Sequence, residues 1–301
     1  MAYNRLMANK HFGEIGDIWK HLPLAEILAI EKPDEYWESH SGAATYPMSH
    51  SFARNYGIYY FRSNARKNPI LGRSAYFKFL ESLTEERRLH RYPGSPYVAM
   101  KTLGNVGRYH FCDIDGVSLV NIRETADNLK ISDDRVINVA RDGVPVLASS
   151  VLGTPVRECE KNFAFIDPYR PFVRSENKMN TLDLLSYLAG RGVKTVLWYG
   201  YDSDEYRQML LAGLKKSLAA YKVDMTKVSL WCGDINLAAM NDATFDESPG
   251  LLGCGIVCAN MSEKAVIACD GLGQELAKIY EKSKFPDGHS GELKYKTIEI
   301  E

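Results

Sequence analysis

The chain has 301 residues, of which 45% are hydrophobic and 25% are charged, and its formal net charge is −1. This is an ordinary globular composition, which argues against disorder. The near-neutral total charge lacks the global electrostatic signature of a nucleic-acid-binding protein. No apolar run approaches the roughly 20 residues that a membrane-spanning helix needs. The polar segment from Met1 to His21 has no apolar core of a signal peptide, and we expect a cytoplasmic protein with no membrane partner.

The expected elements alternate between strands and helices, which is typical of an α/β fold with a mostly parallel sheet. In chain order, the expected strands cover 35–39, 109–113, 136–140, 162–167, 193–199, 227–232 and 252–260. The expected helices cover 117–129, 181–191 and 204–221, and Gly192 is placed to end the second of them. Beyond Phe285, the residues Pro286, Asp287 and Gly288 predict a turn, followed by a last strand or a loose end.

The segment 48–90 interrupts this alternation after the first strand and predicts a mainly helical insertion. The α/β domain would then comprise 1–47 and 91–301. The insertion is basic, since the stretch 54–91 holds nine Lys or Arg against three Glu, a local net charge of +6 in a chain of net charge −1. Positive charge is therefore segregated in the sequence.

The six cysteines are scattered and include no CxxC pair, so we expect reduced thiols that are mostly buried in strands. Cys254 and Cys258 are separated by three residues, and a metal site there is the weaker alternative. The prediction is a protein without a metal.

Ligands of open parallel sheets bind beyond the carboxyl ends of the strands. The first expected strand is followed by His40-Ser41-Gly42-Ala43-Ala44, whose small residues would let backbone N–H groups approach a ligand, or would serve only for packing. The second ends at Asp113, which could accept hydrogen bonds from both hydroxyls of a ribose. Asp115 is the alternative for that role, or a cap of the next helix.

The next two expected strands also end in acids. Asp142-Gly143 could hold the amino group of an adenine or simply make a turn. Asp167-Pro168-Tyr169-Arg170-Pro171-Phe172 combines a carboxylate with aromatic rings, which suits an amine substrate, although an ordinary proline-rich loop would look the same.

Several motifs together resemble one family. They are His11-Phe12-Gly13-Glu14-Ile15-Gly16-Asp17-Ile18-Trp19-Lys20-His21, Glu38-Ser39-His40-Ser41-Gly42-Ala43, Arg91-Tyr92-Pro93-Gly94-Ser95-Pro96, Asp113, Arg141-Asp142-Gly143, Ile166-Asp167-Pro168, Leu197-Trp198-Tyr199 and Gly250-Leu251-Leu252-Gly253-Cys254-Gly255. In these motifs the chain resembles, nearly end to end, the J-type bacterial 23S ribosomal RNA adenine-N6-methyltransferases.

The resemblance implies a Rossmann-like class I fold with a mostly parallel seven-stranded sheet, S-adenosylmethionine (SAM) as the cofactor and S-adenosylhomocysteine (SAH) as its product. The cofactor-binding residues that it implies are Lys20, His21, His40, Gly42, Ser95, Asp113, Asp142, Gly143 and Asp167. It implies catalytic roles for Asp167, Tyr169 and Lys20, with Lys20 near the SAM carboxylate or the substrate entrance rather than solvated on a helix. The substrate would contact Pro168, Tyr169, Arg170 and Phe172.

The chain departs from the family at the acceptor side. The family's Asp-Pro-Pro-Tyr is here Asp167-Pro168-Tyr169-Arg170, and two family histidines are replaced by Ala8 and Ile15. The cofactor half thus looks retained while the acceptor half looks altered, as in an enzyme with a changed substrate or a drifted RNA enzyme.

Three functions follow. The first is N6 methylation of adenine in RNA, where the basic insertion would bind phosphates and its aromatic residues would stack on bases or form the insertion's own core. These aromatic residues are Tyr56, Tyr59, Tyr60, Phe61, Tyr76 and Phe77. The second is methylation of a small-molecule amine or heterocycle whose carboxylate or phosphate pairs with Arg170. The third is a SAM-binding protein without catalysis.

Overall fold

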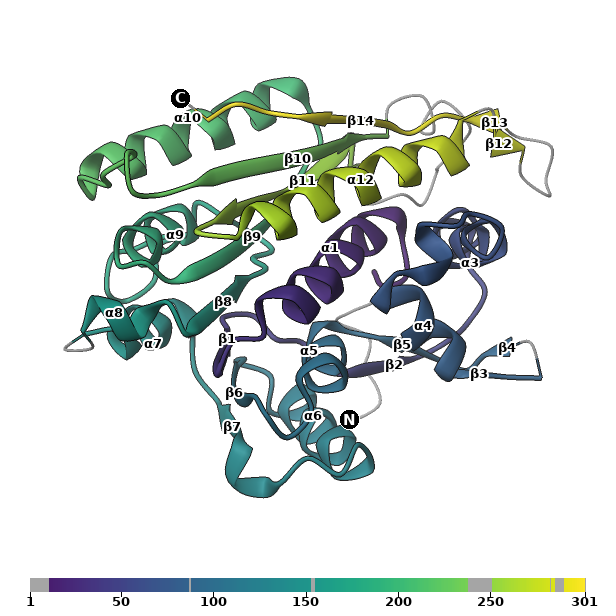
Figure 1. The fold of residues 1–301 in the computed structure, drawn as a ribbon, viewed down its shortest axis with the longest axis horizontal. Helices are drawn as coiled ribbons and strands as arrows, with labels where there is room; N and C mark the ends of the chain where they lie inside the picture. The colour runs from purple at the N-terminus through teal and green to yellow at the C-terminus, as the bar shows by residue number, and fades with distance from the viewer. Residues whose placement is uncertain are drawn as a thin grey trace.

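The computed structural model describes residues 11–86, 88–152, 155–237, 251–281, 283–284 and 290–300. Its centre is a sheet in the order β14-β10-β11-β9-β8-β1-β6-β7, with helices on both faces (Figure 1). The strands are β1 Glu35–Glu38, β6 Arg108–Cys112, β7 Val136–Val139, β8 Asn162–Ile166, β9 Lys194–Tyr201, β10 Leu230–Asn236, β11 Gly253–Ala259 and β14 Lys294–Thr297.

Five neighbouring strands, from β7 to β9, are parallel, and β11 is antiparallel to both β9 and β10. From β10 to β7, the sheet is parallel except for β11, which is the one reversed strand of these seven. This is the arrangement of the Rossmann-like class I SAM-dependent methyltransferases, so the predicted fold class is confirmed.

The described sheet has eight strands rather than the seven expected, because β14 pairs antiparallel with β10. The strand expected over 227–232 also begins later and runs to Asn236. The reason is local: the backbone N–H groups of Lys227 and Val228 donate to the Asp224 carbonyl in a turn. The strand continues through Asp234, a polar residue that nevertheless is fully buried.

The helices of the α/β domain are α1 Ile15–Glu31, α5 Ser95–Leu103, α6 Gly116–Asn128, α7 Gly143–Ser150, α8 Val156–Cys159, α9 Thr181–Gly190, α10 Asp204–Ala220 and α12 Glu263–Tyr280. α9 ends as expected, since Gly192 takes a φ of +83°, a conformation that glycine adopts without strain. α1, α5, α7, α8 and α12 were not expected from the sequence. Apolar cores form on both faces of the sheet, one with α1, α5, α6 and α12 and the other with α7, α9 and α10.

Helix α1 positions the site. It is buried around most of its circumference, packing between α12, α5 and α4, and the Trp19 indole donates a 3.1 Å hydrogen bond to the Gly233 carbonyl of β10. A helix that is apolar on several sides belongs in a core. The packing of α1 therefore fixes the helix, and with it the polar residues that it carries, relative to the sheet.

The segment after β1 contains short elements: α2 Phe52–Arg54, a π-helical turn Asn55–Tyr59, α3 Tyr60–Ala65, a 3₁₀ turn Leu71–Arg73, α4 Ala75–Ser82 and the hairpin β3 Thr84–Glu85 with β4 Arg88–Leu89. Its two ends meet in a ribbon of β2 Thr45–Pro47 and β5 Arg91–Pro93. A Cβ on Gly57 would overlap the Gly13 carbonyl oxygen, so only glycine permits this close approach to the chain that leads into α1. The Tyr280 hydroxyl of α12 donates to the Tyr56 carbonyl at 2.7 Å.

Four of the six aromatic rings in this segment, those of Tyr56, Phe61, Tyr76 and Phe77, are buried in the core. These four rings therefore form the segment's own core, which was the alternative to stacking on bases, and they cannot stack on a base.

All six cysteines are free and buried, and Cys112, Cys232, Cys254 and Cys258 lie in strands. Among the described residues, no group of three or more His, Cys, Asp or Glu side chains is placed to hold a metal ion, and no helix is long and apolar enough to cross a membrane. Ala8, Gly250 and the turn expected over 286–288 lie outside the described residues.

Candidate active site

Four adjacent strands, β7, β6, β1 and β8, carry the sequence-predicted site residues at their carboxyl ends. Asp142 follows β7, Asp113 follows β6, the loop His40–Ala43 follows β1 and Asp167 follows β8. Because these strands are parallel neighbours, the four positions form one row along one edge of the sheet.

The loop after β1 is fixed against β6. The Ser41 backbone N–H donates to the Cys112 carbonyl at 3.0 Å, and the Gly42 N–H donates to Oδ2 of Asp113 at 2.7 Å. Gly42 has a φ of +58°, in the left-handed region that glycine adopts most easily. Oδ1 of Asp113 accepts the Asp115 N–H at 2.8 Å. A carboxylate has about four lone-pair sites, so Asp113 retains acceptor capacity for a diol.

Asp115 caps α6, since its carboxylate accepts the N–H groups of Val117 and Ser118. Asp142 caps α7 in the same way through the Val144 N–H at 3.0 Å. A Cβ on Gly143 would overlap the Ser39 backbone, so the first turn of α7 lies directly against the end of β1. The loop 40–43 and the first turn of α7 thus lie side by side at the row of strand ends, and we refer to these two segments as the cradle.

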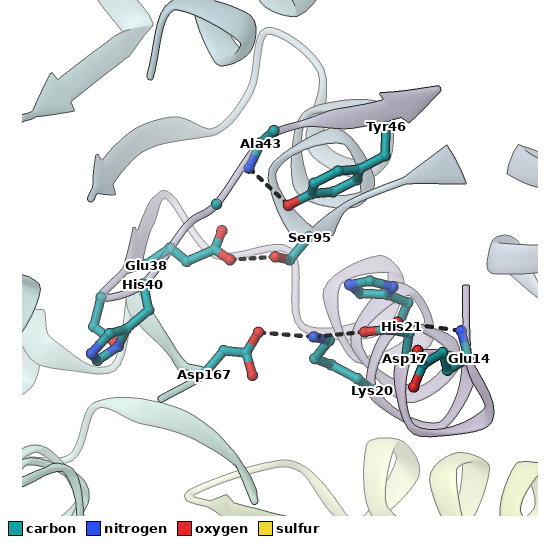
Figure 2. A network of polar contacts seen from close by, with 12 residues as sticks. Glu14, Asp17, Lys20, His21, Glu38, His40, Ala43, Tyr46, Ser95 and Asp167 are labelled. Atoms are coloured by element: carbon teal, nitrogen blue, oxygen red, sulfur yellow. Dashed lines mark hydrogen bonds and ion pairs between the residues drawn. The ribbon is translucent and has the colours of Figure 1, made fainter. Parts of the chain in front are cut away.

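Lys20 of α1 reaches the same edge (Figure 2). Its Nζ lies 2.9 Å from Oδ2 of Asp167 and 3.0 Å from Oδ1 of Asp17, and 5.1 Å from the centre of the Trp198 ring. Burial alone would lower the pKa of Lys20, but the carboxylates of Asp167 and Asp17 outweigh it and raise the pKa above its ordinary value. Lys20 is therefore a charged group within the site and not a solvated helix lysine.

His40 lies beside Asp167 in Figure 2, and its Nδ1 is 2.7 Å from the Ser39 hydroxyl. Burial lowers the pKa of His40, which favours the neutral ring. His21, the other histidine that the resemblance assigns to the cofactor, has different partners from His40. Its Nδ1 lies 2.8 Å from the Tyr92 hydroxyl, and burial and the charge of Lys20 lower its pKa well below the ordinary value. His21 thus joins α1 to β5, and its ring packs beside Tyr76 and Tyr92.

Ser95, the first residue of α5, donates its hydroxyl proton to Oε1 of Glu38 in β1. The other oxygen, Oε2, accepts the Tyr36 hydroxyl at 3.1 Å. Glu38 is fully buried, and burial raises its pKa well above the ordinary value, although both hydrogen bonds oppose this. We expected no role for the side chains of Glu38 and Asp17. Both residues lie in motifs that carry the family resemblance, and Glu38 is also an acid at an inward-facing position of a strand.

The loop after β8 is partly exposed. Tyr169 is 89% exposed, and the Arg170 guanidinium lies 5.9 Å from the centre of its ring, so both side chains lie at the surface after β8. Pro168 is buried beneath them. Phe172 is half-buried and packs edge-on against Tyr206 of α10 at 5.9 Å, so its ring is already engaged in packing.

The positive charge of 54–91 is only partly available at the surface. Arg54 is buried and donates to the Phe12 carbonyl, Arg62 donates to Glu81 and Thr84, and Arg91 donates to Thr45. The exposed basic residues that the structure describes in the stretch are Arg66, Lys67, Arg73, Lys78, Arg88 and Arg91, the last of which keeps its hydrogen bonds to Thr45. Arg87 lies outside the described residues.

Neither a family model nor a curated protein matches the chain. Among solved structures, the protein LPL1258 of Legionella pneumophila, described with the family model DUF519, has a TM-score of 0.72 and 20% identity, covering 96% of this chain and 98% of its own.

Two other structures show much weaker likeness. A SAM-dependent methyltransferase of Agrobacterium tumefaciens has a TM-score of 0.38 and 11% identity over 84% of this chain and 64% of its own. TYW2 of M. jannaschii, in complex with AdoMet, has a TM-score of 0.34 and 10% identity over 83% of this chain and 78% of its own. The strand order, rather than these two likenesses, identifies the fold. The chain therefore has the Rossmann-like α/β fold of class I SAM-dependent methyltransferases, and it shares its fold over nearly its whole length with the Legionella protein.

Proposed function

We propose that the protein is a SAM-dependent N-methyltransferase that transfers a methyl group to the exocyclic amine of adenine in RNA. The observation that carries this proposal is the pair of Asp167 and Lys20. A carboxylate at the end of β8, next to the nucleoside cradle, already accepts a hydrogen bond from a nitrogen at 2.9 Å. An exocyclic amine would use the same acceptor.

The cradle fits the cofactor. Asp142 and Gly143 would hold the adenine, Asp113 would accept hydrogen bonds from the ribose hydroxyls, and the backbone of the loop after β1 would contact the nucleoside. SAM supplies an activated methyl group on a positively charged sulfur.

The residues of the chain orient the acceptor. Asp167 would accept one N–H of the amine and direct the nitrogen lone pair toward the methyl carbon. The new N–C bond would then form as the C–S bond breaks, the sulfur would keep the bonding electrons, and the amine would lose one proton to the Asp167 carboxylate or to water. Tyr169 would cover the face of the base. Lys20 would move from Asp167 toward Asp17, which already lies 3.0 Å from its ammonium group.

Two features support RNA as the substrate: the resemblance to rRNA methyltransferases, and the six exposed basic residues in the described part of 54–91. Basic side chains on one segment would bind phosphates and hold a flexible strand near the site. The buried aromatic rings no longer support base stacking by this segment.

A small molecule is the second candidate, favoured by the exposed pair of Tyr169 and Arg170 beside Asp167. An aromatic ring next to a guanidinium would suit a heterocycle that carries a carboxylate or phosphate.

The test is transfer of labelled methyl from SAM to two separate pools from cells that lack the gene: deproteinised RNA and small-molecule extract. We expect label in RNA as N6-methyladenosine, lost in Asp167→Asn and retained in Asp202→Asn, which changes an exposed acid after β9. Label in the small-molecule pool alone would overturn the RNA proposal. SAM binding with label in neither pool would favour a non-catalytic SAM-binding protein.

A further inference from the structure

We propose, on the basis of the proposed function, that Glu14 is a positioning residue of the methyl transfer. Its negative charge draws the Lys20 ammonium toward Asp17 and so releases Asp167 for the acceptor amine. Glu14 lies at the start of α1 and acts through Asp17 and Lys20 rather than on the substrate itself.

Asp167 is occupied by Lys20, and the proposed reaction needs it free. Its Oδ2 lies 2.9 Å from the Lys20 Nζ, where the amine would otherwise donate. The same ammonium lies 3.0 Å from Oδ1 of Asp17. Because the two distances are nearly equal, Lys20 is shared between two carboxylates. A charge that favours one of these two positions over the other is then sufficient to shift the ammonium, since an equilibrium responds to interactions that differ between its two states.

Glu14 supplies such a difference. Residues 14, 17 and 20 are spaced three apart, so they follow one another along one side of α1. The Glu14 backbone N–H donates to Oδ2 of Asp17 at 3.4 Å, which keeps the two acids together. Figure 2 shows Lys20 between Asp167 and the two acids at the start of α1. A charge on Glu14 therefore stabilises the ammonium more at Asp17 than at Asp167.

The charge of Glu14 depends on its surroundings. In the described part of the chain, the charged or titratable groups that face it are Asp17 on α1, His11 before the helix and Arg54 on α2. Burial, followed by the Asp17 carboxylate, raises the pKa of Glu14, while His11 and Arg54 oppose this. The His11 Nδ1 lies 3.1 Å from Oε1 of Glu14, on a side chain that is 59% exposed. Glu14 therefore ionises at a higher pH than an ordinary glutamate, and His11 favours the ionised form.

Methyl transfer should follow this ionisation. When Glu14 is neutral, it no longer draws the ammonium, and Lys20 remains on Asp167 in competition with the amine. When Glu14 is ionised, Lys20 moves to Asp17 and Asp167 is released. The rate should therefore rise with pH as Glu14 loses its proton.

Glu14→Gln tests this, because it removes the charge and keeps the shape of the side chain. We would measure methyl transfer from labelled SAM to deproteinised RNA of cells that lack the gene, between about pH 5 and 9. At the upper end we expect Glu14→Gln to be about fivefold slower than the wild type, a size typical of one charge acting across a partly screened site. Its profile should lack the rise with pH. His11→Ala should keep the rise and move it to higher pH.

Glu26→Gln is the matched control. Glu26 lies further along the same helix, where its carboxylate accepts the Ala75 backbone N–H, and the substitution removes the same charge. This variant should keep the rate and the pH profile of the wild type.

A measurement without substrate follows the ammonium directly. In protein labelled with carbon-13 at the aspartate carboxyl groups, the NMR resonance of Asp167 can be assigned by its loss in Asp167→Asn. This resonance should move in Glu14→Gln at high pH, because Lys20 then stays on Asp167. It should not move in Glu26→Gln.

Equal rates of Glu14→Gln and the wild type across the pH range would overturn the proposal. A slow Glu14→Gln that keeps the rise with pH would overturn it as well, because the residue would then act on the fold and not through its charge. If the wild type transfers no methyl group to RNA, the proposed function fails. The NMR comparison still decides the role of Glu14 in that case, and an unmoved Asp167 resonance in Glu14→Gln would refute it.

Discussion

Lys20 ties helix α1 to the end of β8, because its ammonium group lies between Asp17 on its own helix and Asp167 on the sheet. Figure 2 shows all three side chains converging on one point of the site. The two ion pairs of Lys20 therefore join the N-terminal motif 11–21 to the Asp-Pro motif 166–168, although these motifs are far apart in sequence.

Removing the charge from Lys20 should destabilise the protein, because two half-buried carboxylates would face one another. We expect Lys20→Met to lower the free energy of unfolding by about 2 kcal/mol, and Asp167→Asn in that background to recover about half. Urea unfolding of the three variants measures this. Lys216→Met, on the exposed surface of α10, is the control and should change stability by less than about 0.5 kcal/mol. An equal effect at both lysines would contradict the ion pair's role.

The raised pKa of Glu38 predicts a stability that depends on pH. The folded protein binds the Glu38 proton more tightly than the unfolded chain, so this group stabilises the fold below the unfolded pKa of about 4.3 and that contribution is lost as pH rises through the folded pKa. Glu38→Gln has no proton to lose. Without ligand, it should gain stability relative to the wild type as pH rises from about 5 to 8. Thermal unfolding across this range checks it, and a constant difference would argue against a neutral buried Glu38.

Two glycines on α12 should respond oppositely to the same substitution. Nothing lies within 4 Å of a Cβ on Gly271, so Gly271→Ala should stabilise the protein by about 0.5–1 kcal/mol through helix propensity. A Cβ on Gly273 would overlap the Tyr295 ring of β14, which is held by Asp270 and by an edge contact with Trp19. Gly273→Ala should therefore cost about 1–3 kcal/mol. Denaturant unfolding of the pair tests the placement of the eighth strand, and similar effects would contradict it.

The cradle has a comparable pair of glycines. A Cβ on Gly143 would overlap the Ser39 backbone, whereas nothing lies near a Cβ on Gly116 at the start of α6. Gly143→Ala should push α7 away from β1 and weaken SAH binding more than about tenfold. Gly116→Ala should bind SAH like the wild type. Calorimetry on both variants decides whether the contact shapes the cofactor site.

The exposed basic residues of the inserted segment should govern affinity for RNA. We expect the triple variant Lys67→Ala, Arg73→Ala and Lys78→Ala to bind RNA more weakly and to show a salt dependence reduced by about two to three counterions. Filter binding at several salt concentrations measures the slope. The double variant Lys215→Ala and Lys216→Ala on α10 should retain the wild-type slope. An identical slope in both variants would place RNA elsewhere or exclude it.

Local patterns in the sequence were sufficient to predict the row of strand ends. The strands before Asp113, Asp142 and Asp167 are short and largely apolar, an acid follows each within three residues, and parallel pairing brings such ends to one edge. Helix α12 was missed because cysteine and two glycines interrupt its apolar stripe. Strand β14 was predicted only as one of two alternatives, a last strand or a loose end, because most of its side chains are exposed and no alternation marks it.

Contacts between distant segments could not be predicted. Lys20 and Asp167 are 147 positions apart, and Ser95 and Glu38 are 57 positions apart, so neither pair leaves a local pattern. The same holds for Arg54 and Arg62, which read as free surface charge in sequence yet hold the inserted segment together. Net charge over a stretch counts such residues without distinguishing the internal from the exposed.

Because all six cysteines are free and buried, the rate at which their thiols react reports how often the structure around them opens. A thiol reagent cannot reach these sulfur atoms in the closed fold, so each thiol reacts only when its surroundings separate. The order in which Cys112, Cys232 and Cys269 acquire a label would rank the opening of β6, β10 and α12. Mass spectrometry of briefly labelled protein could thus map how strongly ligands hold each layer closed, without any engineered probe.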